Sequence, residues 1–276
     1  MQVNKARTHK LIEEMTLFDD MLMNLVFEGN HRATELLLNV ILERDDMKVF
    51  TVRTQQEFRS PFEGGRSVRL DIYAEDSNGK FYDIEVQQAN EGTDPRRARF
   101  NSGRIDSTML MASQEFKELH DSYVIFITRE DVMKGGLPMY HFERICKETG
   151  KQFGDGSYII YVNGEYADVS HPVGKLMHDF WCREPEDMYY PPLIGAVRHF
   201  KREGGQERMS SLLEEYVQEE RQEERQEYSR ELILRMIKRG KYSFADIAET
   251  FEVSLEEVEK IAAMNMDNTV QKNKRM

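Results

Sequence analysis

Residues 67–90, SVRLDIYAEDSNGKFYDIEVQQAN, contain two short runs in which apolar and polar residues alternate, separated by Ser-Asn-Gly. Alternation with a period of two is typical of β-strands that bury one face. Matching the apolar faces places Ile72 opposite Ile84 and requires an odd-numbered loop. We therefore predict a hairpin closed by residues 77–79, with Gly79 in the left-handed conformation. A two-residue Asn-Gly turn would instead turn one apolar face out of the core.

The same register brings two carboxylates together. Asp71 lies opposite Glu85, and the Cβ atoms of directly opposed residues are roughly 5 Å apart. Two carboxylates this close repel each other unless a proton or a cation lies between them. Their hard oxygen atoms suit Mg²⁺ or Mn²⁺. The alternative is a solvent-exposed sheet face with ordinary acidic residues, and the spacing alone does not choose between these two possibilities.

The composition describes a polar globular protein. The 276 residues, of which 39% are hydrophobic and 32% charged, suffice for one large domain and an appendage. No stretch is apolar enough to cross a membrane, and the N-terminus lacks the apolar segment of a secretory signal. Cys146 and Cys182 lie far apart in the sequence, which favours reduced thiols in the cytoplasm.

The charge distribution bears on nucleic-acid binding. A net charge of −12 argues against nonspecific nucleic-acid affinity spread over the whole surface. Residues 51–104 nevertheless contain equal numbers of basic and acidic residues, whereas acidic residues outnumber basic ones in 201–231. The acidic excess is therefore concentrated in the C-terminal part, away from the hairpin.

The order of predicted elements indicates an α/β domain with a mixed sheet flanked by helices, over residues 1–200. Apolar periodicity and turn residues place the elements around the hairpin. They are two helices between Phe18 and Leu42 that break at Gly29-Asn30, a strand at Met47–Thr54, a long helix at Arg96–Leu119, strands at Ser122–Thr128 and Tyr158–Val162, and a helix at Val173–Cys182.

Four arginines stand near the start of the long predicted helix. Arg96, Arg97, Arg99 and Arg104 are spaced so that they partly share one face close to the carboxylates. Guanidinium groups hold phosphate well, so phosphate binding is one interpretation of this cluster. The other is a solvated helix end.

The last quarter of the chain is predicted to be helical throughout. Residues 201–228 form a charged helical linker, and 229–276 form a small segment resembling a helix-turn-helix, with capping boxes at Ser243 and Ser254. The candidate recognition helix begins Leu-Glu-Glu-Val-Glu, which disfavours contact with DNA phosphates and favours protein packing. A further hypothesis is a homo-oligomer formed through these helices.

The line LDIYAEDSNGKFYDIEVQ resembles the core motif of the PD-(D/E)xK nuclease superfamily, in the branch of nuclease-family transposases related to recombination-promoting nucleases. That motif is an Asp on one strand and Glu-x-Lys on the next. Asp71 matches the Asp, and Glu85-Val86-Gln87 matches Glu-x-Lys with Gln in place of the lysine. Asp20 before an apolar helix, PRRARFNSGRID and KRGKYSFADIAETFEVSLEEVEKI also resemble this branch.

The resemblance implies a restriction-endonuclease-like fold and Mg²⁺-dependent (or Mn²⁺-dependent) hydrolysis of DNA phosphodiester bonds. The implied catalytic residues are Asp71, Glu85 and Gln87. The implied metal ligands are Asp71, Glu85 and the backbone carbonyl of Val86, with Asp20 as an additional candidate.

The implied partner is DNA, with its backbone held by Arg97 and Arg99. From the hairpin register we add Arg69, which lies opposite Gln87 and is placed to offset the missing lysine charge. Because Gln87 carries no charge, the alternative function is a catalytically weak or inactive nuclease-fold protein that acts as a DNA- or protein-binding module.

Overall fold

The computed structural model describes the whole chain apart from residues 1–4, 60–63, 89–91, 111 and 263–276. The end of the predicted C-terminal segment therefore lies outside the described residues. The chain divides into two units, Met1–Ser211 and Leu212–Met276. None of the helices in the described part of the chain is long and apolar enough to cross a membrane.

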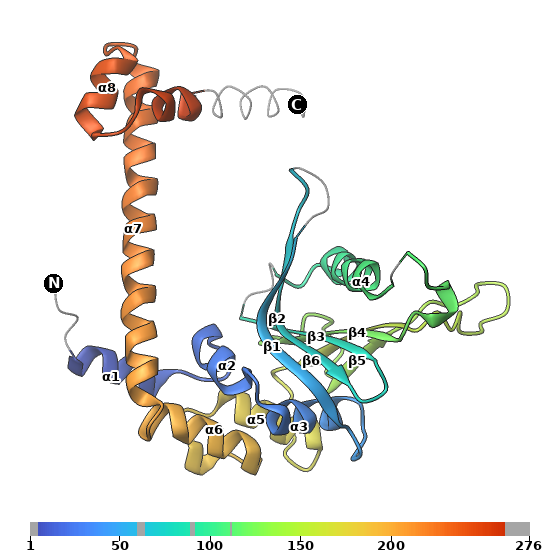
Figure 1. Ribbon diagram of the computed structural model, residues 1–276. Helices are drawn as coiled ribbons and strands as arrows, with labels where there is room; N and C mark the ends of the chain where they lie inside the picture. Colours follow the sequence, from blue (N-terminus) through green and yellow to red (C-terminus); the bar gives the residue numbers. More distant parts are fainter. Residues whose placement is uncertain (1–4, 60–63, 89–91, 111, 263–276) are drawn as a thin grey trace. The chain divides into compact units, whose positions relative to one another are not determined.

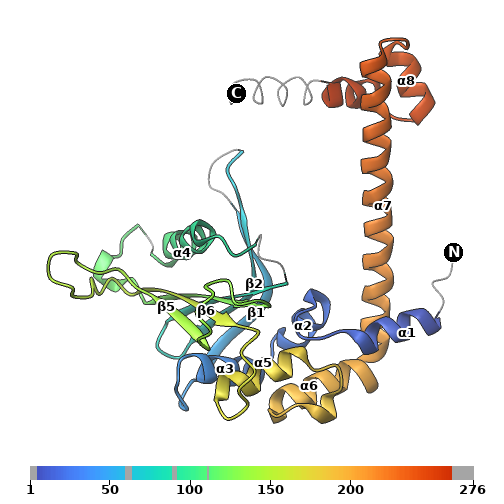
Figure 2. The ribbon, with the colours of Figure 1, turned by 180° about the vertical axis from the view of Figure 1, so that it is seen from behind.

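The first unit is built on a six-stranded mixed sheet with the order β1-β2-β3-β4-β6-β5 (Figures 1 and 2). The strands are β1 (Val49–Phe58), β2 (Val68–Asp76), β3 (Phe81–Gln87), β4 (Ser122–Thr128), β5 (Met139–Phe142) and β6 (Ser157–Asn163). The β3/β4 and β4/β6 pairs are parallel, and the other neighbours are antiparallel. The predicted mixed sheet flanked by helices is confirmed.

Helices cover both faces of this sheet. Helix α4 (Pro95–Met109) makes the crossover that the parallel β3/β4 pair requires, and it lies on one face. The opposite side carries α2, α3, α5 and α6, as Figure 1 shows. The bounds of the remaining helices of this unit are α1 (Lys5–Glu14), α2 (Asp20–Phe27), α3 (His31–Ile41), α5 (Pro172–Trp181) and α6 (Pro191–Arg202), with 3-10 turns at Phe116–Glu118 and Pro185–Asp187.

The core beneath α4 joins the helix to the sheet through apolar side chains. Ala98 and Ile105 of α4 pack on Val124 and Phe126 of β4 and on Tyr161 of β6. The rings of Phe126 and Tyr161 stack with centroids 5.1 Å apart. Because α4 is held on this face, the polar side chains of β2 and β3 that point toward the same face are enclosed rather than solvated.

The hairpin between β2 and β3 has the predicted register. Ile72 pairs with Ile84 and Ala74 with Tyr82. Residues 77–79 close the loop, where the Asp76 N–H donates to the Lys80 carbonyl. Gly79 has φ +76°, in the left-handed region. The apolar faces of the two strands, read from the sequence, therefore determine the turn as well as the pairing.

The regular ladder between β2 and β3 stops at Ile72 and Ile84. If the same register continued, the Val86 N–H would donate to the carbonyl of Leu70 across the strands. Instead, it donates to Oδ2 of Asp71 at 3.0 Å. The two strands therefore separate where Asp71 stands, and a side-chain carboxylate replaces a backbone acceptor.

Helix α4 is shorter than the predicted Arg96–Leu119. It ends at Met109, and the following residue, Leu110, is extended. The last residue of α4 in the core is Ile105, and Phe116 further along is 92% exposed. No apolar face remains to hold more helical turns on the sheet, which is why the helix ends before the predicted position.

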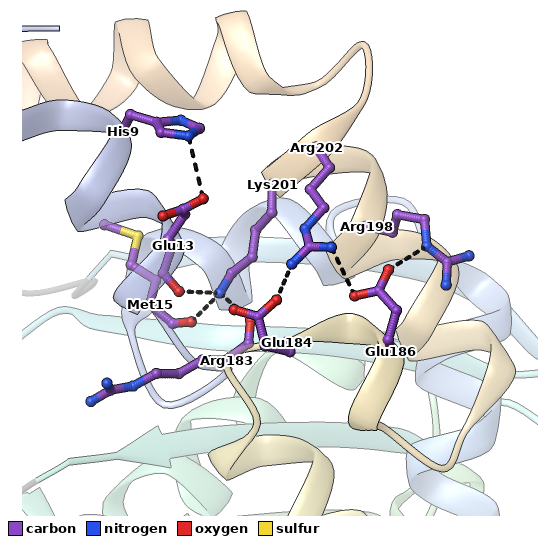
Figure 3. Close-up of polar contacts among 9 residues, drawn as sticks. All are labelled: His9, Glu13, Met15, Arg183, Glu184, Glu186, Arg198, Lys201 and Arg202. Carbon is purple, nitrogen blue, oxygen red and sulfur yellow. Dashed lines mark hydrogen bonds and ion pairs between the residues drawn. The ribbon is translucent and has the colours of Figure 1, made fainter. Parts of the chain in front are cut away.

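A buried lysine ties α6 to the start of the chain (Figure 3). The Lys201 ammonium donates to the backbone carbonyls of Glu13, Met15 and Arg183, at 3.0, 2.5 and 2.7 Å. Arg202, the next residue, forms ion pairs with Glu184 and Glu186. These contacts fix the segment that leads into α2, the helix that begins with Asp20.

In the second unit, the described residues form helices only, as predicted. Helix α7 (Gln206–Arg239) is continuous and begins in the first unit, α8 spans Phe244–Phe251, and residues 255–262 are also helical. The capping box at Ser243 is formed, and Gly240 ends α7 with φ +63°. Ile233, Ile247, Val258 and Ile261 make the small core. The fold class, a mixed sheet flanked by helices with an all-α C-terminal extension, is confirmed.

Candidate active site

The predicted carboxylate pair lies at the point where β2 and β3 separate, beneath α4. Asp71 accepts the Val86 N–H, which fixes one of its oxygen atoms toward β3. Glu85 is fully buried on β3, so the solvent-exposed sheet face considered from the sequence does not describe it. The strand geometry therefore holds both carboxylates in an enclosed place.

Burial destabilises the charged form of both carboxylates. It raises the pKa of Asp71 to about 6, with the charge of Asp20 raising it further and the Val86 N–H lowering it. Burial likewise raises the pKa of Glu85 to about 7, with the charge of Asp71 adding to the rise and that of Arg97 opposing it. A cation placed between these groups would be stabilised, because the negative charges lack sufficient compensation.

Two further polar residues, absent from the predicted set, join this site. Asp83 lies two residues before Glu85 on β3 and is also fully buried. Asn101 of α4 donates to Oδ2 of Asp83 at 3.0 Å and to Oε1 of Glu85 at 3.4 Å. Burial, and then the charge of Glu85, raises the pKa of Asp83 well above its ordinary value. Oδ1 of Asp83 is buried without a hydrogen-bond partner.

Gln87, in the position of the family's lysine, contacts an arginine from α4. Nη1 of Arg97 donates to Oε1 of Gln87 at 3.4 Å, and Nη2 of Arg97 lies 2.5 Å from Oε2 of Glu85. Nε2 of Gln87 is 3.4 Å from the same Glu85 oxygen. Gly92 packs tightly here, since a Cβ added to it would lie 1.8 Å from Oε1 of Gln87. These contacts hold the amide and the guanidinium together beside Glu85.

Asp20 and Arg69 lie near Asp71 and interact with each other. Burial raises the pKa of Asp20, the charge of Asp19 raises it further, and Arg69 lowers it. Arg69 is exposed and stands opposite Glu57 of β1. We expected Arg69 to lie opposite Gln87, but the β2/β3 ladder that would align them ends at Ile72. The arginine that contacts Gln87 is Arg97 of α4.

The four arginines of α4 do not share one environment. Arg97 faces the carboxylates, as does Asn101 four residues further on. Arg96 and Arg99 instead line a cavity on another side of the helix, and Arg104, on nearly the same side as Arg97, lines it about two turns further along. Residues one and two positions from Arg97 point elsewhere, because successive residues are separated by about 100° around a helix.

The donor set fits a hard divalent cation in its chemistry. It consists of carboxylate oxygens, which Mg²⁺ and Mn²⁺ prefer, and it includes the unpartnered Oδ1 of Asp83. The described residues contain no ready-formed cluster of three or more His, Cys, Asp and Glu side chains that could hold a metal ion. A cation is favoured instead by the carboxylate chemistry of the ligands and by the cost of burying their negative charges.

Comparison with known proteins identifies the family. Neither the curated proteins nor the solved structures gave a match to the chain. The family model of the PD-(D/E)XK nuclease family transposase matches residues 20–182, more than half of the chain. The match begins at Asp20, ends within the segment after α5, and includes the hairpin and α4. The chain therefore belongs to the family of PD-(D/E)XK nuclease family transposases.

Proposed function

We propose that the protein is a metal-dependent DNA endonuclease that hydrolyses phosphodiester bonds, of the transposase or recombination-promoting nuclease type. The observation that carries this proposal is the pairing of half-buried Asp71 with fully buried Glu85, whose pKa values are raised chiefly by burial, so that a cation would stabilise their charged forms. Membership in a nuclease family supports the same chemistry.

The proposed cofactor is Mg²⁺ or Mn²⁺, held by the carboxylates of Asp71 and Glu85 and by the Val86 carbonyl, with Asp20 as an additional ligand. The Val86 carbonyl is a reasonable donor because, in a strand, it points to the same side as the N–H that meets Asp71. A bound ion of this kind polarises a phosphate oxygen and lowers the pKa of a coordinated water.

The remaining residues have roles that their contacts support. Gln87 orients a water through its amide, and Arg97 supplies the positive charge that an amide lacks, from 3.4 Å away. A guanidinium keeps its charge at any pH at which the protein is folded, and it stabilises developing negative charge on phosphate. Arg69, Arg97 and Arg99 are the proposed contacts to the DNA backbone.

Cleavage of supercoiled plasmid in the presence of Mg²⁺ or Mn²⁺ tests the proposal. We expect wild type to convert supercoiled plasmid to open circles. Asp71→Ala should be slower by more than about a hundredfold, since loss of a metal ligand costs more than the 10–100-fold effect of removing a residue that only orients a ligand. Glu75→Gln, on the same strand, is the matched control and should stay within about twofold. Absence of metal-dependent cleavage by wild type would contradict the proposal.

A specific observation favours the alternative of a binding module. Oε2 of Glu85 is occupied by the Arg97 guanidinium at 2.5 Å, and Gln87 adds no charge of its own. In that case wild type binds DNA in EDTA but cleaves none with either metal, and Asp71→Ala binds as wild type does. Measuring cleavage and binding on the same preparations separates the two functions.

A further inference from the structure

A cavity of about 920 Å³ lies between α4 and the residues that flank β1 and β2. Figure 1 shows the ends of these two strands projecting beyond the rest of the sheet, on the side of α4. We name this space the arginine cavity after its wall, whose described residues include no acidic side chain. The charged and aromatic residues of the wall are Arg59, Arg66, Arg96, Arg99, Arg104 and Phe100.

The arginine cavity is separate from the carboxylate site. Arg96, Arg99, Gly103 and Ser107 recur along α4 at intervals of three or four residues, so they form one stripe on the helix. The stripe that faces the carboxylates contains Arg97 and, four residues on, Asn101. Arg104, seven residues after Arg97, continues this second stripe, so the cavity adjoins the carboxylate site along the helix while Arg97 and Asn101 stay outside its wall.

Most of the positive charge in the arginine cavity is not neutralised by the protein. Within the described residues, Arg66, Arg99 and Arg104 have no acidic partner at ion-pair distance, whereas Arg59 and Arg96 each have one, at 3.1 and 3.7 Å. These two pairs are solvent-exposed, and such pairs bind weakly. The cavity therefore keeps a positive potential inside a protein of net charge −12.

One donor in the wall is buried and unsatisfied. Nε of Arg104 is inaccessible to solvent and has no hydrogen-bond partner in the described structure. A desolvated cationic donor without an acceptor is unfavourable, and an anionic acceptor removes that penalty. Because solvent does not reach this atom, an anion in the cavity would contact Nε only after the Arg104 side chain moves.

The remaining features of the wall select the kind of anion. Phe100 is 45% exposed and offers a ring on which a base can stack. A duplex, whose major groove alone is about 12 Å wide, would present one backbone but no unstacked base to a cavity of about 920 Å³. A separated strand, with its phosphates spaced along the chain and its bases free to stack, matches both the arginines and the ring.

We propose that the arginine cavity binds a single strand of DNA, with the arginines on successive phosphates and a base against Phe100. The proposal rests on the nuclease function above and specifies the form of its substrate near the site. Binding there needs no metal and no intact carboxylate pair. It is therefore measured independently of cleavage.

The proposal is tested by measuring the affinity for a labelled twelve-nucleotide oligothymidylate by fluorescence anisotropy, in EDTA and at several salt concentrations. Three to five phosphate contacts predict that log K falls against log salt concentration with a slope of about −2 to −3.5. Arg99→Gln and Arg104→Gln should each weaken binding about five- to tenfold and make the slope shallower by about 0.7. Lys151→Gln, an equal charge change on an exposed lysine elsewhere, should stay within about twofold.

The arginine variants also change side-chain packing, so a pair of variants at Gly103 tests the effect of charge alone. A Cβ added to Gly103 meets nothing within 4 Å, so side chains at this position enter open space. Gly103→Glu should weaken binding more than about tenfold through its charge. Gly103→Gln, of the same size, should weaken it by less than about threefold. Phe100→Ala should weaken binding about tenfold without changing the salt slope, because stacking is not ionic.

Three outcomes would overturn the proposal. Equal binding by Gly103→Glu and Gly103→Gln would mean that the strand lies elsewhere. A twelve-base-pair duplex bound as tightly as the single strand would remove the selection for separated strands. Competition by inorganic phosphate as effective as that by oligothymidylate would reduce the cavity to a simple anion site. If only the proposed nuclease function is wrong, oligothymidylate still binds in the arginine cavity, but neither Mg²⁺ nor Mn²⁺ supports cleavage.

Discussion

Helix α4 separates two regions of opposite charge. On one side, Asp71, Asp83 and Glu85 lie enclosed beneath the helix with raised pKa values. On the other, arginines line a cavity, and none of the described residues of its wall is acidic. Negative charge is thus confined where the proposed metal would bind, and positive charge is gathered where the proposed DNA strand would lie. The comparison shows how a protein of net charge −12 can be compatible with DNA binding, because the basic residues need to be concentrated only at the binding surface.

The largest expected effect comes from the carboxylate region. Glu85→Gln keeps the side-chain shape and the hydrogen bond from Asn101 but removes the charge. We expect metal-dependent plasmid cleavage to fall more than about a hundredfold, while anisotropy in EDTA shows DNA affinity within about twofold of wild type. Equal losses of cleavage and affinity would mean that the two regions are not separate.

Two arginines of α4 should differ in the kinetic constant they change. Arg97 touches Glu85 and Gln87, so Arg97→Gln should lower kcat about 10–100-fold by removing charge beside the reacting phosphate. Arg99 lines the cavity, so Arg99→Gln should raise KM about five- to tenfold with kcat nearly unchanged. Steady-state kinetics on an oligonucleotide substrate make the comparison. Identical profiles for the two variants would break it.

The carboxylate region also predicts a dependence of stability on pH. Folding raises the pKa of Asp71 to about 6 and that of Glu85 to about 7, whereas unfolded carboxyls titrate near pH 4. The metal-free folded state therefore binds more protons than the unfolded state between about pH 4 and 7, so stability is greatest below this window and falls as pH rises through it.

Urea unfolding in EDTA at pH 5 and pH 8 measures this dependence. We expect wild type to lose about 4 kcal/mol over that range from these groups, and Glu85→Gln to lose distinctly less. Arg99→Gln, on the other side of α4, should follow the wild-type pH dependence. Parallel curves for wild type and Glu85→Gln would show that Glu85 is not titrating in this window.

The smallest expected effect comes from crowding Gln87. The added methyl group of Gly92→Ala would collide with the Gln87 amide and lie 3.1 Å from Nη1 of Arg97. Both side chains are flexible, so we expect the cleavage rate to fall only about three- to tenfold, with DNA affinity in EDTA unchanged. Gly195→Ala, whose Cβ meets nothing within 4 Å on α6, is the control. A Gly92→Ala rate equal to wild type would argue against a role for Gln87.

Local sequence patterns predicted the parts of the fold that depend on neighbours in the chain. The break at Gly29-Asn30 was predicted because both residues interrupt helices, and α2 and α3 end and begin beside it. The buried strand β4 was predicted from its continuous apolar run. Strand β5 was missed because it has only four residues, follows a proline, and lies half-exposed at the sheet edge. Its pairing with β6, rather than its own sequence, makes it a strand.

The sequence by itself determined the register of the hairpin as far as Ile72 and Ile84, because strand side chains alternate with a period of two, and it placed Asp71 and Glu85 directly beyond this last pair. It did not reveal Asp83 and Asn101 as members of the site, although each follows from the same periodicities once α4 is known to cover that face. Only the tertiary structure decided that Arg97 rather than Arg69 meets Gln87. The physical reason is that the angle of α4 on the sheet, and the point where β2 leaves β3, depend on the packing of residues distant in the chain.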